Sequence, residues 1–266
     1  MNILVCIKQV PDTTEIKIDP VKKTLIRAGV PSIVNPYDAY ALELAAMWKD
    51  RVPETRITVL SMGPEQAKAA LYECLATGAD NAYLVSGRGF GGSDTLATSY
   101  ILSRAVKKVE ETEGPFDLIL CGRQAIDGDT AQVGPEMAEH LGLPQVTCAL
   151  EFSADDTTVT VRKKTDTGFE RLQADLPCLV TVTKTAFEPR YASRRALRNA
   201  QAQEITVLGE ADLDVEETRI GLSGSPTKVK KTYAFSNEKE TVTFTDEPGP
   251  AMAEQLYARL VADKIV

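Results

Sequence analysis

Short apolar runs alternate with amphipathic segments along roughly the first 145 residues of the chain. The runs are typical of buried strands, and apolar residues at helical spacing in the other segments predict helices. This alternation predicts the α/β class, with a Rossmann-like, mostly parallel sheet and helices on both faces. The predicted strands cover residues 2–9, 56–60, 81–85 and 117–121, and the predicted helices cover 37–49, a segment ending near 78, 94–111 and 137–141.

The pattern changes after this region. Residues 146–152, 158–163 and 168–172 alternate like antiparallel strands, and residues 179–183 form another apolar run. Residues 12–27 predict a polar hairpin.

Residues 212–242 show no core periodicity, and an amphipathic helix is predicted over 250–263. We therefore expect a nucleotide-binding α/β domain over 1–190 and a partner-docking helix and C-terminal arm over 191–266, the alternative being a disordered or locally tucked extension. The apolar anchors of this arm would be Val229, Tyr233, Phe235 and Phe244.

Polar or glycine-rich turns follow each of the four predicted parallel strands, at residues 8–11, 61–64, 86–94 and 122–134. Ligands of parallel sheets bind at the carboxyl ends of the strands, so these turns can converge on one crevice. Such a convergence predicts a ligand of nucleotide size.

The turn at 122–134 joins a predicted strand to a predicted helix. Unpaired N–H groups and the dipole at a helix start favour an anion such as phosphate. Gly128 and Gly134 permit close backbone approach, and Asp127 and Thr130 can cap the helix or bind ligand hydroxyls. The local pattern leaves two alternatives, a phosphate-binding turn and an ordinary turn with a capped helix.

Composition narrows the possible functions. The net charge of −8 argues against nucleic acid or an anionic membrane as a general partner, and no apolar run has the length of a membrane span. The first strand follows Met1 without a basic region or cleavage site, so we expect a cytoplasmic protein. Five scattered cysteines and a single histidine favour neither a metal site nor a catalytic triad. The cluster Arg190, Arg194, Arg195 and Arg198 fits protein docking better than nucleic acid.

Four segments carry a resemblance to a known family, at residues 5–12, 35–38, 122–134 and 188–193. Through them the chain resembles, over essentially its whole length, the beta (small) subunit of the electron-transfer flavoproteins. Residues 35–43 and 90–99 resemble the electron-bifurcating type. The resemblance implies a heterodimer with an FAD-carrying alpha subunit, and a crevice that holds FAD in the bifurcating type or AMP in simple carriers.

The resemblance also implies which residues meet the nucleotide. The adenine and ribose would lie near Lys8, Asn35, Ser61, Met62 and Gly63. The diphosphate would meet Asp127, Gly128, Asp129, Thr130, Gln132, Val133 and Gly134. The ribityl chain and flavin would lie towards Ser93, Asp94, Thr95 and Thr98, unless these side chains only cap or decorate a helix.

No catalytic acid or base is expected of the chain, because the flavin would perform the redox chemistry. The bifurcating type implies NADH as hydride donor, with one electron passing through the alpha-subunit flavin and one to ferredoxin or flavodoxin. Tyr37 would reach the neighbouring subunit's flavin. The alternatives are a simple carrier with structural AMP and, from another class, a stand-alone ATP-binding α/β protein.

The family's docking region corresponds to Arg190, Tyr191, Arg194 and Leu197, and its partner would be an acyl-CoA dehydrogenase or another flavin or quinone oxidoreductase. The family usually places an aliphatic residue where this chain has Arg194. A charged side chain cannot fill an apolar pocket without a large desolvation cost. Either Leu197 replaces that anchor, or the partner differs or offers an acidic pocket.

Overall fold

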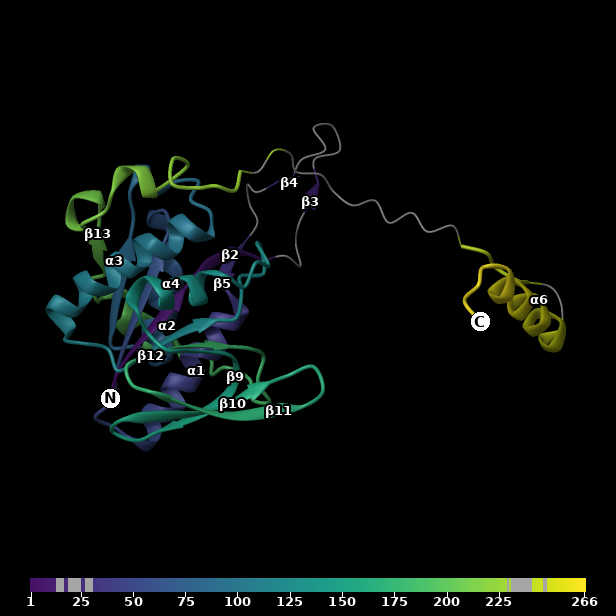
Figure 1. Ribbon diagram of the computed structural model, residues 1–266, viewed down its shortest axis with the longest axis horizontal. Helices are drawn as coiled ribbons and strands as arrows, with labels where there is room; N and C mark the ends of the chain where they lie inside the picture. Colours follow the sequence, from purple (N-terminus) through teal and green to yellow (C-terminus); the bar gives the residue numbers. More distant parts are fainter. Residues whose placement is uncertain (13–16, 19–24, 27–30, 229, 231–240, 246–247) are drawn as a thin grey trace.

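The computed structural model describes residues 1–12, 17–18, 25–26, 31–228, 230, 241–245 and 248–266. Most of them form an α/β body around a nine-stranded sheet (Figure 1). In spatial order its strands are β11 (Phe169–Asp175), β10 (Thr158–Lys164), β9 (Gln145–Ala154), β12 (Cys178–Val182), β8 (Leu118–Gly122), β1 (Asn2–Ile7), β6 (Arg56–Met62), β7 (Asn81–Val85) and β13 (Thr206–Leu208).

Helices cover both faces of this sheet, as predicted. Side chains alternate along β1, so that Ile3 and Val5 enter one core while Leu4 and Cys6 enter the other. The first core is covered by α1 (Pro36–Arg51), α2 (Lys68–Thr77) and α5 (Arg194–Gln201), and the second by α3 (Thr95–Glu113) and α4 (Val133–Leu141).

The strands from β9 to β13 in this order run parallel, while β10 and β11 add to the β9 edge as antiparallel strands. The predicted α/β class with antiparallel additions is therefore confirmed. From β1 the chain proceeds through β6 and β7 on one side, then returns to place β8 on the other side. Such a reversal of strand order is where open α/β sheets hold their ligands.

Two short antiparallel pairs lie outside the main sheet. Strand β2 (Gln9–Pro11) pairs with β5 (Ser32–Val34), and β3 (Lys17–Ile18) pairs with β4 (Leu25–Ile26). The second pair agrees with the predicted hairpin, whose other residues lie outside the described part of the chain.

The chain beyond residue 190 contributes more to the body than its sequence pattern indicated. Strand β13 pairs with β7 at the sheet edge, and Leu208, Leu213 and Ile220 are buried in the α3–α4 core. Residues 212–242 have no core periodicity of their own, but Leu213 and Ile220 pack into the core of the body. Three isolated apolar residues, separated by polar ones, leave no periodic signal, although they bury well against an existing surface.

The last helix, α6 (Gly249–Ala262), has no buried residue. Leu256, Tyr257 and Val261 are exposed on it, and Met252 and Leu260 are half-buried. Phe244 is also half-buried, while the predicted anchors Val229, Tyr233 and Phe235 lie outside the described residues. None of the helices in the described part of the chain has the length and apolar character needed to cross a membrane.

Candidate functional site

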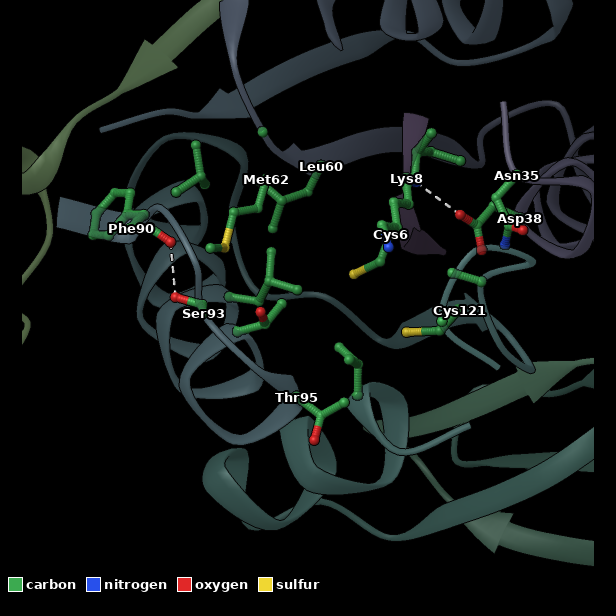
Figure 2. A pocket seen from close by; sticks show the side chains of 18 of the residues that line it. Cys6, Lys8, Asn35, Asp38, Leu60, Met62, Phe90, Ser93, Thr95 and Cys121 are labelled. Carbon is green, nitrogen blue, oxygen red and sulfur yellow. Dashed lines mark hydrogen bonds between the residues drawn. The ribbon is translucent and has the colours of Figure 1, made fainter. Parts of the chain in front are cut away.

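The four predicted strand-end turns converge on one cleft at the carboxyl edge of the sheet (Figure 2). Residues that follow β1, β6, β7 and β8 all line it, and its volume is about 860 Å³. It lies where the strand order reverses between β1 and β8. Its position and size are those of a site for a nucleotide-sized ligand.

Most of the residues that the sequence assigned to a nucleotide line this cleft. They are Lys8, Asn35, Met62, Gly63, Ser93, Asp94, Thr95, Thr98, Gly128, Thr130, Gln132, Val133 and Gly134. Ser61 is fully buried in β6 and does not line it. Asp127 and Asp129 also fall outside the lining, although they belong to the turn that forms one wall.

The turn between β8 and α4 presents backbone N–H groups to the cleft. Asp129 and Ala131 have positive φ angles of 53° and 55°. Within the described part of the chain, the N–H groups of Thr130, Ala131 and Gln132 have no hydrogen-bond acceptor. Three successive free donors at the start of α4 form the kind of site that binds a phosphate.

Asn35 holds this turn in place. Its Nδ2 donates to the carbonyl of Gln124 at 2.9 Å, and its Oδ1 accepts from the N–H of Ile126 at 3.2 Å. Asp127 and Asp129 do not line the cleft but bond to residues that do. Asp127 pairs with Lys8 Nζ at 2.7 Å, and Asp129 accepts from Gln124 Nε2 at 2.6 Å. The pair of Lys8 and Asp127 is largely exposed, so we expect it to contribute little stability.

Two glycines in this region serve different purposes. A Cβ added to Gly134 would lie 2.7 Å from Thr181 Cγ2, so this glycine permits close packing of α4 on β12. A Cβ added to Gly128 would meet no protein atom within 4 Å. The protein itself therefore has room for a side chain at Gly128, which faces the cleft.

Asp38 joins the ends of the two central strands. Its Oδ2 accepts from the N–H of Lys8 at 2.7 Å and its Oδ1 from the N–H of Gly122 at 3.0 Å. Burial raises the pKa of Asp38 to about 7, against opposing effects of Asn35, these N–H groups and the charge of Lys8. A carboxyl group that is partly protonated near neutral pH repels a nearby phosphate less than a full carboxylate would.

The polar side chains at the glycine-rich turn after β7 bond mainly to the protein. Ser93 Oγ donates to the carbonyl of Phe90 at 2.8 Å, and Asp94 caps α3 by accepting from the N–H of Ala97 at 3.1 Å. Thr95 Oγ1 lies 3.3 Å from oxygens of both Gln132 and Glu136. The capping role considered for these residues is therefore present in Asp94, and their contact with a ligand stays a prediction.

The predicted docking residues do not line the cleft; they lie beside α1 and on α5. Arg190 donates to Glu43 Oε2 at 2.9 Å and to Asp50 at 2.7 Å, and these bonds raise its pKa. Tyr191 is 97% exposed, and Arg194 is exposed in the first turn of α5. Leu197 is half-buried, one turn further along.

Several residues that line the cleft were not assigned to the ligand from the sequence, among them Cys6, Asp38, Phe90 and Cys121. Cys6 and Cys121 are neighbours on β1 and β8. Their apolar surroundings in the sequence indicate only burial. Asp38 did offer a signal, because a carboxylate two residues after Pro36 falls in the first turn of a predicted helix, near the strand ends.

Comparison with known proteins identifies relatives of the whole chain. A family model described as the electron transfer flavoprotein domain matches residues 22–213. The electron transfer flavoprotein subunit beta of Megasphaera elsdenii is 49% identical over 270 residues, with 100% of both chains covered. The subunit of the same name from Clostridium acetobutylicum is 52% identical over 262 residues, with 98% of both chains covered. The subunit CarD of the caffeyl-CoA reductase-Etf complex of Acetobacterium woodii is 48% identical over 234 residues, with 88% of both chains covered.

Proposed function

Because the chain belongs to the electron transfer flavoprotein family as a beta subunit, we propose that its cleft binds FAD. Membership in this family implies electron transfer together with an alpha-subunit partner, which leaves the stand-alone ATP-binding protein without support. Beyond family membership, the proposal names FAD as the ligand of the cleft and NADH as the hydride donor. It names a dehydrogenase and ferredoxin or flavodoxin as the electron acceptors.

The convergence of four turns on a cleft of about 860 Å³ carries the proposal. The free N–H groups of Thr130, Ala131 and Gln132 would hold the diphosphate. Lys8, Asn35, Met62 and Gly63 would surround the adenosine. The lining continues past the phosphate turn to Ser93, Thr95 and Thr98, where AMP would leave space that a flavin can fill.

A bound flavin supplies hydride and single-electron chemistry. The residues of this chain bind it, orient it and exclude water on the side of the apolar wall formed by Leu60, Val85, Phe90 and Leu102. With the alpha subunit, the protein would take a hydride from NADH, and its two electrons would pass to a dehydrogenase and to ferredoxin or flavodoxin.

Cofactor counting on the purified heterodimer tests this proposal. We expect two FAD molecules and no AMP per heterodimer, measured by absorbance and chromatography of the released nucleotides. One FAD with one AMP would overturn the FAD assignment and favour a simple carrier. Anaerobic NADH oxidation that reduces ferredoxin only when the dehydrogenase acceptor is present would support the NADH assignment.

The C-terminal arm and the docking region complete the proposal. We assign α6 to contact with the alpha subunit, because none of its residues is buried and Leu256, Tyr257 and Val261 are exposed on it. Slower deuterium exchange of α6 amides upon heterodimer formation checks this. The name of the Acetobacterium relative supports a partner that acts on coenzyme A thioesters. Exposed Arg194 would meet an acidic patch on that partner.

Two arginines in this region should behave differently. Arg190→Ala removes the guanidinium from the buried Glu43, which keeps only the bond from the N–H of residue 190, so we expect the free energy of unfolding to fall by about 2 kcal/mol. Arg194→Ala removes no ion pair within the described residues, and we expect unchanged stability but severalfold slower electron transfer to the dehydrogenase at low salt. Urea unfolding and stopped-flow kinetics measure the two effects. An Arg194→Ala protein with normal transfer rates would contradict the docking assignment.

A further inference from the structure

The segment 219–227 lies against the glycine-rich turn after β7, and three of its residues bond to that turn. Gly221, Ser225 and Thr227 bond to Ser93 and Asp94, which line the cleft. We call these three residues the clasp. They stand more than 120 positions away in the sequence, so nothing in the local pattern of either segment indicates the contact.

The hydrogen bonds of the clasp form a connected network. Ser225 Oγ accepts from the N–H of Asp94 at 2.8 Å and donates to the carbonyl of Gly221 at 2.6 Å. Ser93 Oγ accepts from the N–H of Gly221 at 3.1 Å, and Asp94 Oδ2 accepts from the N–H of Thr227 at 2.9 Å. Ser225 is 3% exposed, so the loss of its hydroxyl would leave buried groups unpaired.

The backbone of the two segments also fits closely. Gly221 has a φ of 55°, and a Cβ added to it would lie 2.2 Å from the carbonyl oxygen of Gly89. A Cβ added to Gly92 would lie 2.7 Å from Leu222 Cδ2. The contact therefore requires glycine at position 221, and the φ of 78° favours glycine at position 92.

The residues just before the clasp are fixed on α3. Arg219 stacks over the ring of Tyr100 at 3.8 Å, and the hydroxyl of Tyr100 accepts from the N–H of Glu216 at 3.1 Å. Ile220 is buried in the α3–α4 core. The segment that carries the clasp is therefore attached to α3 and to the α3–α4 core, and it connects the glycine-rich turn to them.

We propose that the clasp is a positioning device for the flavin end of the cleft, a role that rests on the proposed binding of FAD. Ser225 holds the N–H of Asp94, and this bond fixes the turn that forms the wall beyond the phosphate site. The adenylate end is built from the turns after β1, β6 and β8, and among the described residues no hydrogen bond of the clasp reaches these turns. Loss of the clasp therefore weakens binding of FAD and spares binding of AMP.

The experiment uses the complete heterodimer with Ser225→Ala, and with Ser223→Ala as the matched control. Ser223 is exposed and makes no side-chain hydrogen bond to the described residues. Titrations of FAD and AMP into heterodimer whose cleft has been emptied give the two affinities, with the flavin retained in the alpha subunit as an internal reference. Deuterium exchange of residues 88–95 reports the turn directly, whichever nucleotide is bound. Gly221→Ala, which pushes the clasp from Gly89, is a second variant.

For Ser225→Ala and Gly221→Ala, we expect about tenfold weaker FAD binding, AMP affinity within twofold of wild type, and faster exchange at Asp94. Ser223→Ala should match wild type. Equal weakening of FAD and AMP would overturn the proposal in favour of a general structural role, and so would unchanged FAD affinity or unchanged exchange. A wild-type heterodimer with AMP instead of FAD in the cleft would refute the proposed function, and faster exchange at Asp94 in Ser225→Ala would then still support the clasp as the device that holds the turn.

Discussion

Gly122→Ala is expected to prevent the chain from reaching its native fold or to lower its free energy of unfolding by about 4 kcal/mol. The added Cβ would lie 2.2 Å from Asp38 Oδ1 and 2.8 Å from the backbone of Tyr37. Asp38 cannot retreat without losing the N–H groups of Lys8 and Gly122, which it holds between β1, β8 and α1. Steric overlap and unpaired buried polar groups therefore act together. Urea unfolding followed by fluorescence of the single tryptophan, Trp48, measures the loss.

Gly168→Ala is the matched control for this change. Gly168 lies in the turn before β11, where an added Cβ would meet nothing within 4 Å. We expect its stability to stay within about 0.5 kcal/mol of wild type, as for most surface substitutions. A stable Gly122→Ala protein would show that α1 can move away from β8 at low cost, and that Asp38 does not fix the strand ends.

The central part of the fold could be predicted because each element carries its own periodic signal. Strand 81–85 was predicted with the bounds that β7 has, and helix 94–111 corresponds to α3 at Thr95–Glu113. Four strands of one parallel sheet bring their following turns to one edge, so the cleft could also be predicted from the order of elements alone.

Long-range contacts left no comparable signal. The position of Asp38 between Lys8 and Gly122 depends on how α1 packs across two strands, which local periodicity does not encode. The same holds for β13 and for Ser225, because a three-residue edge strand and a single buried hydroxyl have no pattern of their own. The assignment of Arg190 to a docking region stays a prediction, and its bonds to Glu43 were not foreseen.

Gly128→Val is expected to weaken nucleotide binding about a hundredfold, or roughly 2.7 kcal/mol, with little effect on stability. The protein offers no atom within 4 Å of an added Cβ, so the fold has no need of glycine here. Under the proposed function, nucleotide binding does require glycine at position 128. This position faces the part of the cleft where the N–H groups of Thr130 and Ala131 would bind a phosphate. Equilibrium titration of FAD and of AMP into heterodimer freed of nucleotide measures the change.

Substitutions in the turn at 122–134 and in the clasp should affect the two nucleotides differently. FAD and AMP share the phosphate next to the adenosine, so Gly128→Val should weaken both, whereas Ser225→Ala should weaken FAD alone. Gly128→Ala, with a smaller side chain, should fall between wild type and Gly128→Val. Undiminished binding in Gly128→Val would mean that the phosphate lies elsewhere along the cleft, and the assignment of the turn at 122–134 would then have to be abandoned. Because the protein has room for a side chain at this position, weaker binding in Gly128→Val could not be attributed to misfolding.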